Sequence, residues 1–193
     1  MKLANSKAKL GLGLVVAVLA SAIAPQGMLK AVQLADGTTV FDSPPRLVSF
    51  VTTRDHTNDK QATYYVTVNV LPEAGESLKT LQVSLIEGRF RFLDYQLDEI
   101  QVFQGDRGNQ GDALAIESAQ YDEATQTLTV RLAEAAAPGQ LITFGLSPVR
   151  NPSRGGVYLF EVTATPEGDL PVAQRVGTGR LNIFRPDGND PFD

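Results

Sequence analysis

Two arginines lie close together in residues 150–156, which read Arg-Asn-Pro-Ser-Arg-Gly-Gly. The guanidinium groups of Arg150 and Arg154 could hold a carboxylate or a sulfate through paired hydrogen bonds. The same two side chains could instead pair with acidic neighbours and tie this loop to the rest of the fold. We therefore name Arg150 and Arg154 as candidate binding residues and leave both roles open.

A second polar stretch, residues 106–112, offers oxygen atoms to a hard cation. Asp106, Asn109 and Asp112 carry the carboxylate and amide oxygens that Ca²⁺ prefers, and two glycines would let the loop curl around an ion. The spacing is not that of an EF-hand, and Arg107 adds a positive charge within the loop. A calcium site and a simple polar turn are the two interpretations, and no other cofactor is expected.

Carboxylates also gather near an aromatic ring, as Asp94, Asp98 and Glu99 around Tyr95. A glycosidase needs two carboxyl groups roughly 5–9.5 Å apart across a cleft, so this group is the candidate for a glycan-acting enzyme. Scatter of the three side chains over the surface would exclude that interpretation. Exposed aromatic rings in one plane would instead favour simple sugar binding.

The single histidine, His56, lies in the polar stretch 53–60 next to Asp55. It could act as a general base or a metal ligand, or be an exposed loop residue. We expect the exposed residue, because no G-x-S-x-G motif and no second histidine accompanies it. Residues 87–92 alternate arginine with phenylalanine, which is typical of a groove for nucleic acid or glycan, or of a strand with its phenylalanines inward. The acidic composition favours the strand.

Composition excludes several classes of protein. The 193 residues include no cysteine and one histidine, which rules out disulfides, thiolate metal sites, a cysteine nucleophile and any site with two imidazoles. The formal net charge of −5 argues against a nucleic-acid partner.

The first 22 residues differ from the rest of the chain. Lys2, Lys7 and Lys9 precede an uncharged apolar run from Leu10 to Ala20, and Ala20-Ser21-Ala22 follows as a cleavage motif. This layout predicts a signal peptide over residues 1–22 and an exported, periplasmic or extracellular protein. An uncleaved leader is the only membrane contact expected. We divide the remaining chain into a lead-in (23–37), a folded domain (38–185) and a flexible tail (186–193).

Apolar and polar residues alternate along most of the folded domain, as in strands with one buried face. The alternation predicts an all-β, antiparallel, immunoglobulin-like sandwich of nine to ten strands, with a closed barrel as the alternative. The likeness to immunoglobulin domains is architectural, since no Cys…Trp…Cys pattern is present. We further expect one helical turn within residues 132–137 and a turn at 177–179. The expected strands cover residues 38–41, 47–52, 63–70, 81–85, 98–103, 113–117, 128–132, 142–146, 158–164 and 181–183.

Three stretches together resemble a known family. The mature start from Val32, the run Pro148–Phe160 (PVRNPSRGGVYLF) and Gly177–Leu181 (GTGRL) are similar to an uncharacterised secreted family of cyanobacteria, a family of domains of unknown function. The resemblance implies export and a single all-β domain. It implies no activity and assigns no site residues.

Taken together, these features predict an exported, non-enzymatic module of the cell envelope or extracellular matrix. Its expected partners are a protein, a glycan or another envelope component, and self-association is a further possibility through edge strands. The alternatives are a carbohydrate-binding or glycan-acting protein, and a calcium-dependent adhesion module that uses Asp106, Asn109 and Asp112.

Overall fold

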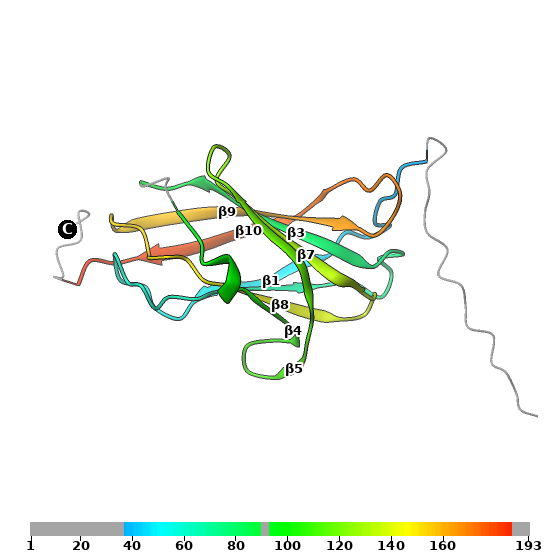
Figure 1. Cartoon of the computed structure of the whole chain (residues 1–193), viewed down its shortest axis with the longest axis horizontal. Coiled ribbons are helices and arrows are strands. Elements are labelled where there is room, and N and C mark those ends of the chain that lie inside the picture. Colours follow the sequence, from blue (N-terminus) through cyan, green and yellow to red (C-terminus); the bar gives the residue numbers. More distant parts are fainter. Residues whose placement is uncertain (1–36, 90–92, 187–193) are drawn as a thin grey trace, which may run out of the picture.

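The computed structural model describes residues 37–89 and 93–186, and in these residues the chain forms ten strands and one short 3-10 helix (Figure 1). The predicted leader, residues 23–36 of the lead-in and residues 187–193 of the tail lie outside the described residues. The elements in chain order are β1 (Arg46–Thr52), β2 (Tyr64–Asn69), β3 (Leu78–Glu87), η1 (Leu97–Glu99), β4 (Gln101–Gly105), β5 (Gln110–Ala113), β6 (Ile116–Asp122), β7 (Thr127–Ala136), β8 (Leu141–Leu146), β9 (Gly156–Pro166) and β10 (Gln174–Ile183).

The strands build two five-stranded sheets, in the orders β1-β2-β8-β4-β5 and β10-β9-β3-β7-β6. Neighbouring strands within each sheet run antiparallel. In Figure 1, β9, β10, β3 and β7 form the upper layer, and β8, β4 and β5 lie below them. The predicted antiparallel, immunoglobulin-like sandwich of nine to ten strands is confirmed, and the alternative of one closed barrel is wrong.

The core between the sheets consists of the alternating residues that the sequence pattern predicts. In β2, the side chains of Tyr64, Val66 and Val68 are fully buried, and Val66 pairs across the sheet with Phe144 of β8. Burying one side chain of this size stabilises the fold by about 1.5–3 kcal/mol. The opposite sheet supplies the facing layer with Leu81, Val83, Leu85, Leu128, Val130, Leu132, Tyr158, Phe160, Val162, Leu181 and Ile183.

Two glycines of β10 let the edge strands of the two sheets approach each other. A Cβ atom on Gly177 would lie 2.8 Å from the Cβ of Leu47 in β1. A Cβ on Gly179 would overlap the ring of Phe50, which stacks on Phe160 with ring centroids 4.9 Å apart. The prediction of a turn at 177–179 is wrong, because these residues lie within a strand that needs glycine for its packing.

The chain before β1 does not form the strand predicted for residues 38–41. Thr39 makes a single parallel bridge with Pro171. Beyond it, the side-chain amide of Gln174 accepts a hydrogen bond from the backbone N–H of Phe41 (2.6 Å) and donates one to the carbonyl of Phe41 (3.2 Å). A side chain thus takes the place of a neighbouring strand, so no ladder continues there.

The helical turn predicted within residues 132–137 is also absent, because β7 runs on to Ala136. The backbone N–H of Ala133 donates to the carbonyl of Ala115 (2.8 Å), and Ala136 pairs with Leu78 of β3. Pairing on both sides of the strand therefore overrides the helix propensity of alanine.

Two expected strands are interrupted. Residues 113–117 span the corner at which the chain leaves β5 for β6 in the other sheet, where the N–H of Leu114 donates to the carbonyl of Val102 (2.8 Å). Residues 98–103 begin in the three-residue η1 before entering β4. Neither η1 nor any other helical stretch of the described chain is long and apolar enough to cross a membrane.

Candidate binding site

One buried amide, that of Asn151 in the β8–β9 loop, holds together the loops at one end of the sandwich. Asn151 is 1% exposed, and its Oδ1 accepts a hydrogen bond from the hydroxyl of Tyr64 (2.8 Å). Its Nδ2 donates to the carbonyls of Arg54 (3.0 Å) and His56 (2.9 Å), and its backbone N–H donates to the carbonyl of Asp59 (2.7 Å). Because a buried polar group is costly to leave unpaired, these bonds fix the β1–β2 and β8–β9 loops relative to each other.

Leu93 and Asp94, which precede η1, also contact the loops at this end. The N–H of Val149 donates to the carbonyl of Asp94 (2.8 Å), and the N–H of Leu93 donates to Oε1 of Gln126 (2.9 Å). Gln126 closes the β6–β7 turn with φ of +53°, and its Nε2 donates to the carbonyl of Glu123 (2.9 Å). A positive φ at a residue other than glycine costs about 1–3 kcal/mol, which these hydrogen bonds offset.

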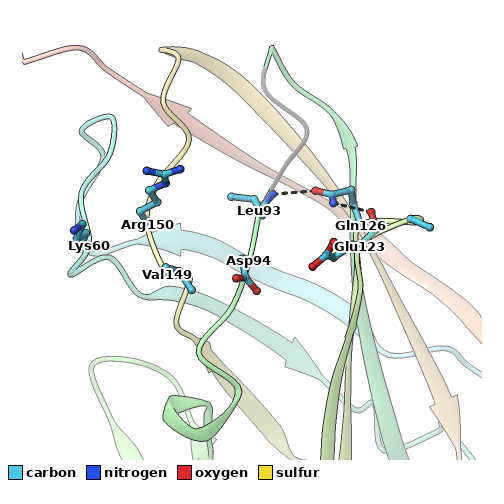
Figure 2. A pocket seen from close by; sticks show the side chains of 8 residues that line it. Lys60, Leu93, Asp94, Glu123, Gln126, Val149 and Arg150 are labelled. Atoms are coloured by element: carbon cyan, nitrogen blue, oxygen red, sulfur yellow. Dashed lines mark hydrogen bonds between the residues drawn. The ribbon is translucent and has the colours of Figure 1, made fainter.

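A pocket of about 730 Å³ opens between these segments (Figure 2). Figure 2 shows Lys60 and Arg150 on one side, Glu123 on the other side, and Asp94 between them. Positive and negative charge are therefore separated across the pocket. Its lining residues are Lys60, Leu93, Asp94, Glu123, Ala124, Gln126, Val149 and Arg150.

The four charged residues of this pocket are all exposed. Within residues 37–89 and 93–186, the side chains of Lys60, Arg150 and Glu123 form no ion pair. Asp94 uses one carboxylate oxygen to accept the backbone N–H of Tyr95 (2.8 Å). The pocket can therefore bind a ligand that carries an anionic and a cationic group on a partly apolar body.

The acidic side of the pocket is backed by Tyr121, whose buried hydroxyl has no hydrogen-bond partner in the described structure. Burial, followed by the negative charges of Asp94, Glu123 and Asp122, raises the pKa of the Tyr121 phenol to about 12. Its ring packs edge-on against Tyr95, with centroids 5.2 Å apart. The phenol therefore stays neutral at pH 7, and the carboxylates of Asp94 and Glu123 carry the negative charge on this side.

The two predicted arginines share one loop but have different surroundings. Arg150 lines the pocket, whereas Arg154 does not, and the backbone carbonyl of Arg154 accepts a hydrogen bond from the hydroxyl of Tyr158 (2.6 Å). Both side chains are exposed, and neither forms an ion pair with a carboxylate of the described residues. The loop is tied to its neighbours by Asn151 instead.

Of the three carboxylates predicted near Tyr95, only Asp94 lines this pocket. Asp98 and Glu99 lie exposed in η1. The second carboxylate of the pocket is that of Glu123, which the β6–β7 turn contributes. The structure therefore does not bring the predicted group together in the pocket as a pair of catalytic carboxyls.

In the β4–β5 loop, the carboxylate of Asp106 forms hydrogen bonds with the backbone of the same loop. Oδ1 of Asp106 accepts hydrogen bonds from two backbone N–H groups of the loop, including that of Asn109 (2.8 Å). Arg107 lies over the ring of Tyr65, with Cζ 5.5 Å from the ring centroid, and Asp112 is exposed on β5. Among the described residues, no group of three or more histidine, aspartate or glutamate side chains is placed to hold a metal ion.

The aromatic residues on the outer face of the first sheet do not form a flat platform. Tyr65 and Phe103 meet edge to face at 64°, with centroids 6.4 Å apart. Phe103 is only 6% exposed. This pair lacks the exposed, coplanar rings that we expected of a sugar-binding surface, and Phe90 and Phe92 lie outside the described residues.

His56 is an exposed loop residue, as expected. Its Nδ1 lies 3.5 Å from Oδ1 of Asp55, and both side chains are at least half exposed. The backbone around His56 forms a parallel bridge with Phe184. The N–H of Thr57 donates to the carbonyl of Phe184 (2.8 Å), and the N–H of Phe184 donates to the carbonyl of Asp55 (2.7 Å). This pairing brings the end of β10 to the same end of the sandwich as the pocket.

Three polar residues that line the pocket, Lys60, Glu123 and Gln126, are not among the candidate residues that the sequence offers. Lys60 lies in the polar stretch 53–60, and Glu123 lies between the strands expected over residues 113–117 and 128–132, so the sequence places both residues in loops. Nothing in the sequence indicates that these loops meet, because they connect strands of different sheets. A glutamine at positive φ leaves no sequence signal either, since glutamine is not favoured there.

Comparison with known proteins gives a family match without a function. A family model described as "Protein of unknown function (DUF2808)" matches residues 38–183. No curated protein sequence matches the chain.

Several solved structures have a similar arrangement of strands at low identity. A collagen-binding domain from a Staphylococcus aureus adhesin is 9% identical with a TM-score of 0.36, and the match covers 72% of this chain and 98% of that one. The collagen-binding subdomain of an Enterococcus faecalis surface protein is 7% identical with a TM-score of 0.40, and the match covers 69% and 94%. A chain described with manganese lipoxygenase of Gaeumannomyces graminis and zonadhesin of Komagataella pastoris is 10% identical with a TM-score of 0.41, and the match covers 74% of this chain and half of that one. These similarities say nothing about what the present chain binds.

Proposed function

The chain belongs to the DUF2808 family of proteins of unknown function, and we propose that it is an exported, non-enzymatic module that binds a protein ligand at the loop end of its sandwich. The charged, apolar and small-residue layout of residues 1–22 supports export. The ligand is then a protein of the cell envelope or the extracellular matrix.

The observation that carries the proposal is the separation of charge across the pocket. Lys60 and Arg150 lie on one side of the pocket with no ion pair in the described chain, and Asp94 and Glu123 supply the opposite charge. A polypeptide segment offers carboxylates, cations and apolar side chains in one molecule, so it can match both sides. A neutral glycan would leave all four charges unpaired, and a nucleic acid would match one side only.

A binding role without catalysis is supported by where the titratable side chains lie. Asp98 and Glu99 lie outside the pocket, and His56 is exposed beside Asp55. Asp94 and Glu123 are both exposed, so no buried acid faces a nucleophile there. The lining is suited to holding a charged segment in place.

The affinity should be weak. Each exposed ion pair contributes about 0.2–1 kcal/mol, so the four charged side chains supply at most about 4 kcal/mol, to which apolar contact with the exposed Val149 adds. A dissociation constant of about 0.1–1 mM is therefore expected for a short peptide.

Selection from a random peptide library tests the proposal. The mature domain is the bait, and a variant with Lys60→Glu and Arg150→Glu is the parallel bait. We expect peptides enriched on the natural domain to carry an acidic and a basic residue around an apolar one, and the acidic residue to disappear from peptides enriched on the variant. Enrichment of the same peptides on both baits, or no enrichment above an empty support, would overturn the proposal.

A further inference from the structure

The last described residues of the chain lie beside the loops that form the pocket. Phe184, directly after β10, forms a parallel bridge with His56 of the β1–β2 loop. A Cβ atom on Gly155 of the β8–β9 loop would lie 3.7 Å from the backbone nitrogen of Arg185. In Figure 1, β10 runs toward the end of the sandwich that holds both loops. The chain therefore leaves β10 at the pocket end, next to the β1–β2 and β8–β9 loops.

The two cations of the pocket are carried by these same loops. Lys60 lies in the β1–β2 loop and Arg150 in the β8–β9 loop, on one side of the pocket (Figure 2). The loops meet where the N–H of Asn151 donates to the carbonyl of Asp59 (2.7 Å), so the sequence neighbours of the two cations are in direct contact. Neither cation has an ion-pair partner in the part of the chain that the structure describes. Two available positive charges therefore lie near the point at which the described chain ends.

The sequence that follows this point carries the opposite charge. Residues 187–193, which lie outside the described residues, read Asp-Gly-Asn-Asp-Pro-Phe-Asp and include no lysine or arginine. We call this segment the acidic tail. Its three aspartates could neutralise both cations, and its phenylalanine supplies an apolar side chain.

The acidic tail is long enough to reach the cations. Seven residues span up to about 25 Å when extended. The N–H of Thr57 donates to the carbonyl of Phe184 (2.8 Å), and Lys60 is three residues beyond Thr57, which is at most about 11 Å of chain. Pro186 is two residues beyond Phe184, or at most about 7 Å. Even with both distances at their maximum, the tail spans the gap.

We propose that the acidic tail of the same chain occupies the cationic side of the pocket and competes there with the peptide ligand, an inference that rests on the proposed function. The aspartates of the tail pair with Lys60 and Arg150, and Phe192 packs on the exposed Val149. Exposed ion pairs are individually weak. A tethered segment meets its site at an effective concentration in the millimolar range, however, so contacts too weak to hold a free peptide can hold the tail.

The acidic side of the pocket explains how a ligand displaces the tail. The tail has no cation, so it leaves the carboxylates of Asp94 and Glu123 unpaired. A peptide that carries both an acidic and a basic residue pairs with both sides and gains contacts that the tail does not make. The tail therefore excludes purely acidic segments more effectively than it excludes ligands that match the whole pocket.

Paramagnetic broadening of NMR signals measures where the tail lies. The chain has no cysteine, so Asn189→Cys gives a single attachment site for a nitroxide and keeps all three aspartates. In the mature domain with this label, we expect the amide signals of Gln61 and Val149 to lose more than half of their intensity relative to the reduced label. A variant with Lys60→Glu and Arg150→Glu should recover most of that intensity.

A charge-matched control with Arg46→Glu and Arg180→Glu, two exposed arginines away from the pocket, should keep the broadening. Persistence of the broadening in the pocket variant, or its loss in both variants, would overturn the proposal. Broadening in isotope-labelled chains that are mixed with separate nitroxide-bearing chains would mean that a second copy supplies the tail, which also overturns it. No peptide ligand is present, so failure here is distinguishable from failure of the proposed function.

Competition is measured by calorimetry with the peptide selected on the natural domain. A variant with Asp187→Asn, Asp190→Asn and Asp193→Asn should bind this peptide about 3-fold more tightly, because the ligand no longer has to displace the tail. Unchanged affinity would show that the tail does not compete.

The control for this measurement changes three exposed carboxylates at the opposite end of the sandwich, with Glu73→Gln, Glu134→Gln and Asp169→Asn. Its affinity for the peptide should equal that of the natural domain. Equal tightening in the control and the tail variant would mean that net charge alone governs binding, and would overturn the proposal. Thermal unfolding checks that every variant is folded.

Discussion

The β8–β9 loop and the β4–β5 loop have similar compositions, since each contains arginine, asparagine and glycine, yet they use these residues in opposite ways. In the β4–β5 loop, the carboxylate of Asp106 binds the loop's own backbone and Arg107 lies over Tyr65. In the β8–β9 loop, the buried Asn151 makes the structural bonds, and Arg150 has no ion pair within the described chain. A loop whose uncharged groups supply its rigidity leaves its charges available for a ligand.

The difference bears on the two interpretations that the sequence left open for each loop. Asp106 and Asn109 lie in a turn that the carboxylate of Asp106 holds, and Asp112 lies exposed on β5, so calcium binding by these three residues stays a prediction. The predicted anion-binding residues lie on a loop that is fixed by a neighbour in sequence. Composition alone does not distinguish the two cases, because what matters is which residue is buried.

The largest effect is expected from Asn151→Ala. The substitution removes three side-chain hydrogen bonds and leaves the hydroxyl of Tyr64 and the carbonyls of Arg54 and His56 without this partner. We expect a loss of about 3 kcal/mol in the free energy of unfolding, measured by urea denaturation. Asn109→Ala in the β4–β5 loop is the matched control and should change stability by less than about 0.5 kcal/mol. Similar values for the two variants would contradict the structural role of Asn151.

A smaller loss is expected from Gly179→Ala, which tests the close contact of β1 with β10. The new methyl group would overlap the ring of Phe50 and force the two sheets apart. Overpacking of this kind destabilises by about 1–3 kcal/mol. Gly108→Ala in the β4–β5 loop, where the nearest atom would lie at 3.4 Å, is the control and should be almost neutral. A Gly179→Ala protein as stable as the control would show that the sheets are less tightly packed than described.

Asp106→Ala and Arg150→Ala should show opposite patterns. Asp106→Ala removes two hydrogen bonds to the backbone and should lower the free energy of unfolding by about 1 kcal/mol without changing peptide binding. Arg150→Ala should leave stability within about 0.5 kcal/mol and weaken binding of the selected peptide severalfold. Urea denaturation measures the free energy of unfolding of each variant, and calorimetry measures its dissociation constant for the selected peptide. Loss of binding with Asp106→Ala at unchanged stability would reverse the roles assigned to the two loops.

The smallest effect concerns pH and Tyr121. Because the pKa of Tyr121 is raised to about 12 in the folded protein, the unfolded chain loses this proton first as pH rises above about 10. The stabilising contribution is therefore complete below pH 10 and declines between pH 10 and 12. At pH 7, Tyr121→Phe should unfold at the same temperature as the natural protein or slightly higher, since the buried hydroxyl has no partner in the described structure. Between pH 10 and 11, the variant should lose less stability than the natural protein, because it has no phenol to titrate at this position. Identical pH profiles for both proteins would show that Tyr121 titrates normally.

The strand pattern predicts most of the fold because period-2 alternation directly reflects which face is buried. Tyr64, Val66 and Val68 are examples, and all three are fully buried. The errors occur where a long-range contact overrides a local preference. Ala133 continues a strand because its N–H donates to the carbonyl of Ala115. Gly179 lies in a strand and not in a turn, and it is glycine because the ring of Phe50 occupies the space that a side chain would need.

The site is less predictable, because it depends on which loops meet. Arg150 and Asp94 can be recognised as chemically capable residues, but their position across one pocket follows from the pairing of the two sheets. Asn151 appears in the sequence as an ordinary loop residue. Its burial and its bonds to Tyr64 become visible only when the β1–β2 loop is placed beside it.

The most direct test of the account exchanges charge between the pocket and its ligand. Calorimetry would compare the peptide selected on the natural domain with a copy whose acidic residue is changed to lysine, each against the natural domain and the Arg150→Glu variant. We predict that the variant binds the original peptide at least 10-fold more weakly and recovers most of that loss with the lysine copy. Equal weakening of both peptides, or no weakening of the original, would contradict the claim that the unpaired charges of the loop end bind the ligand.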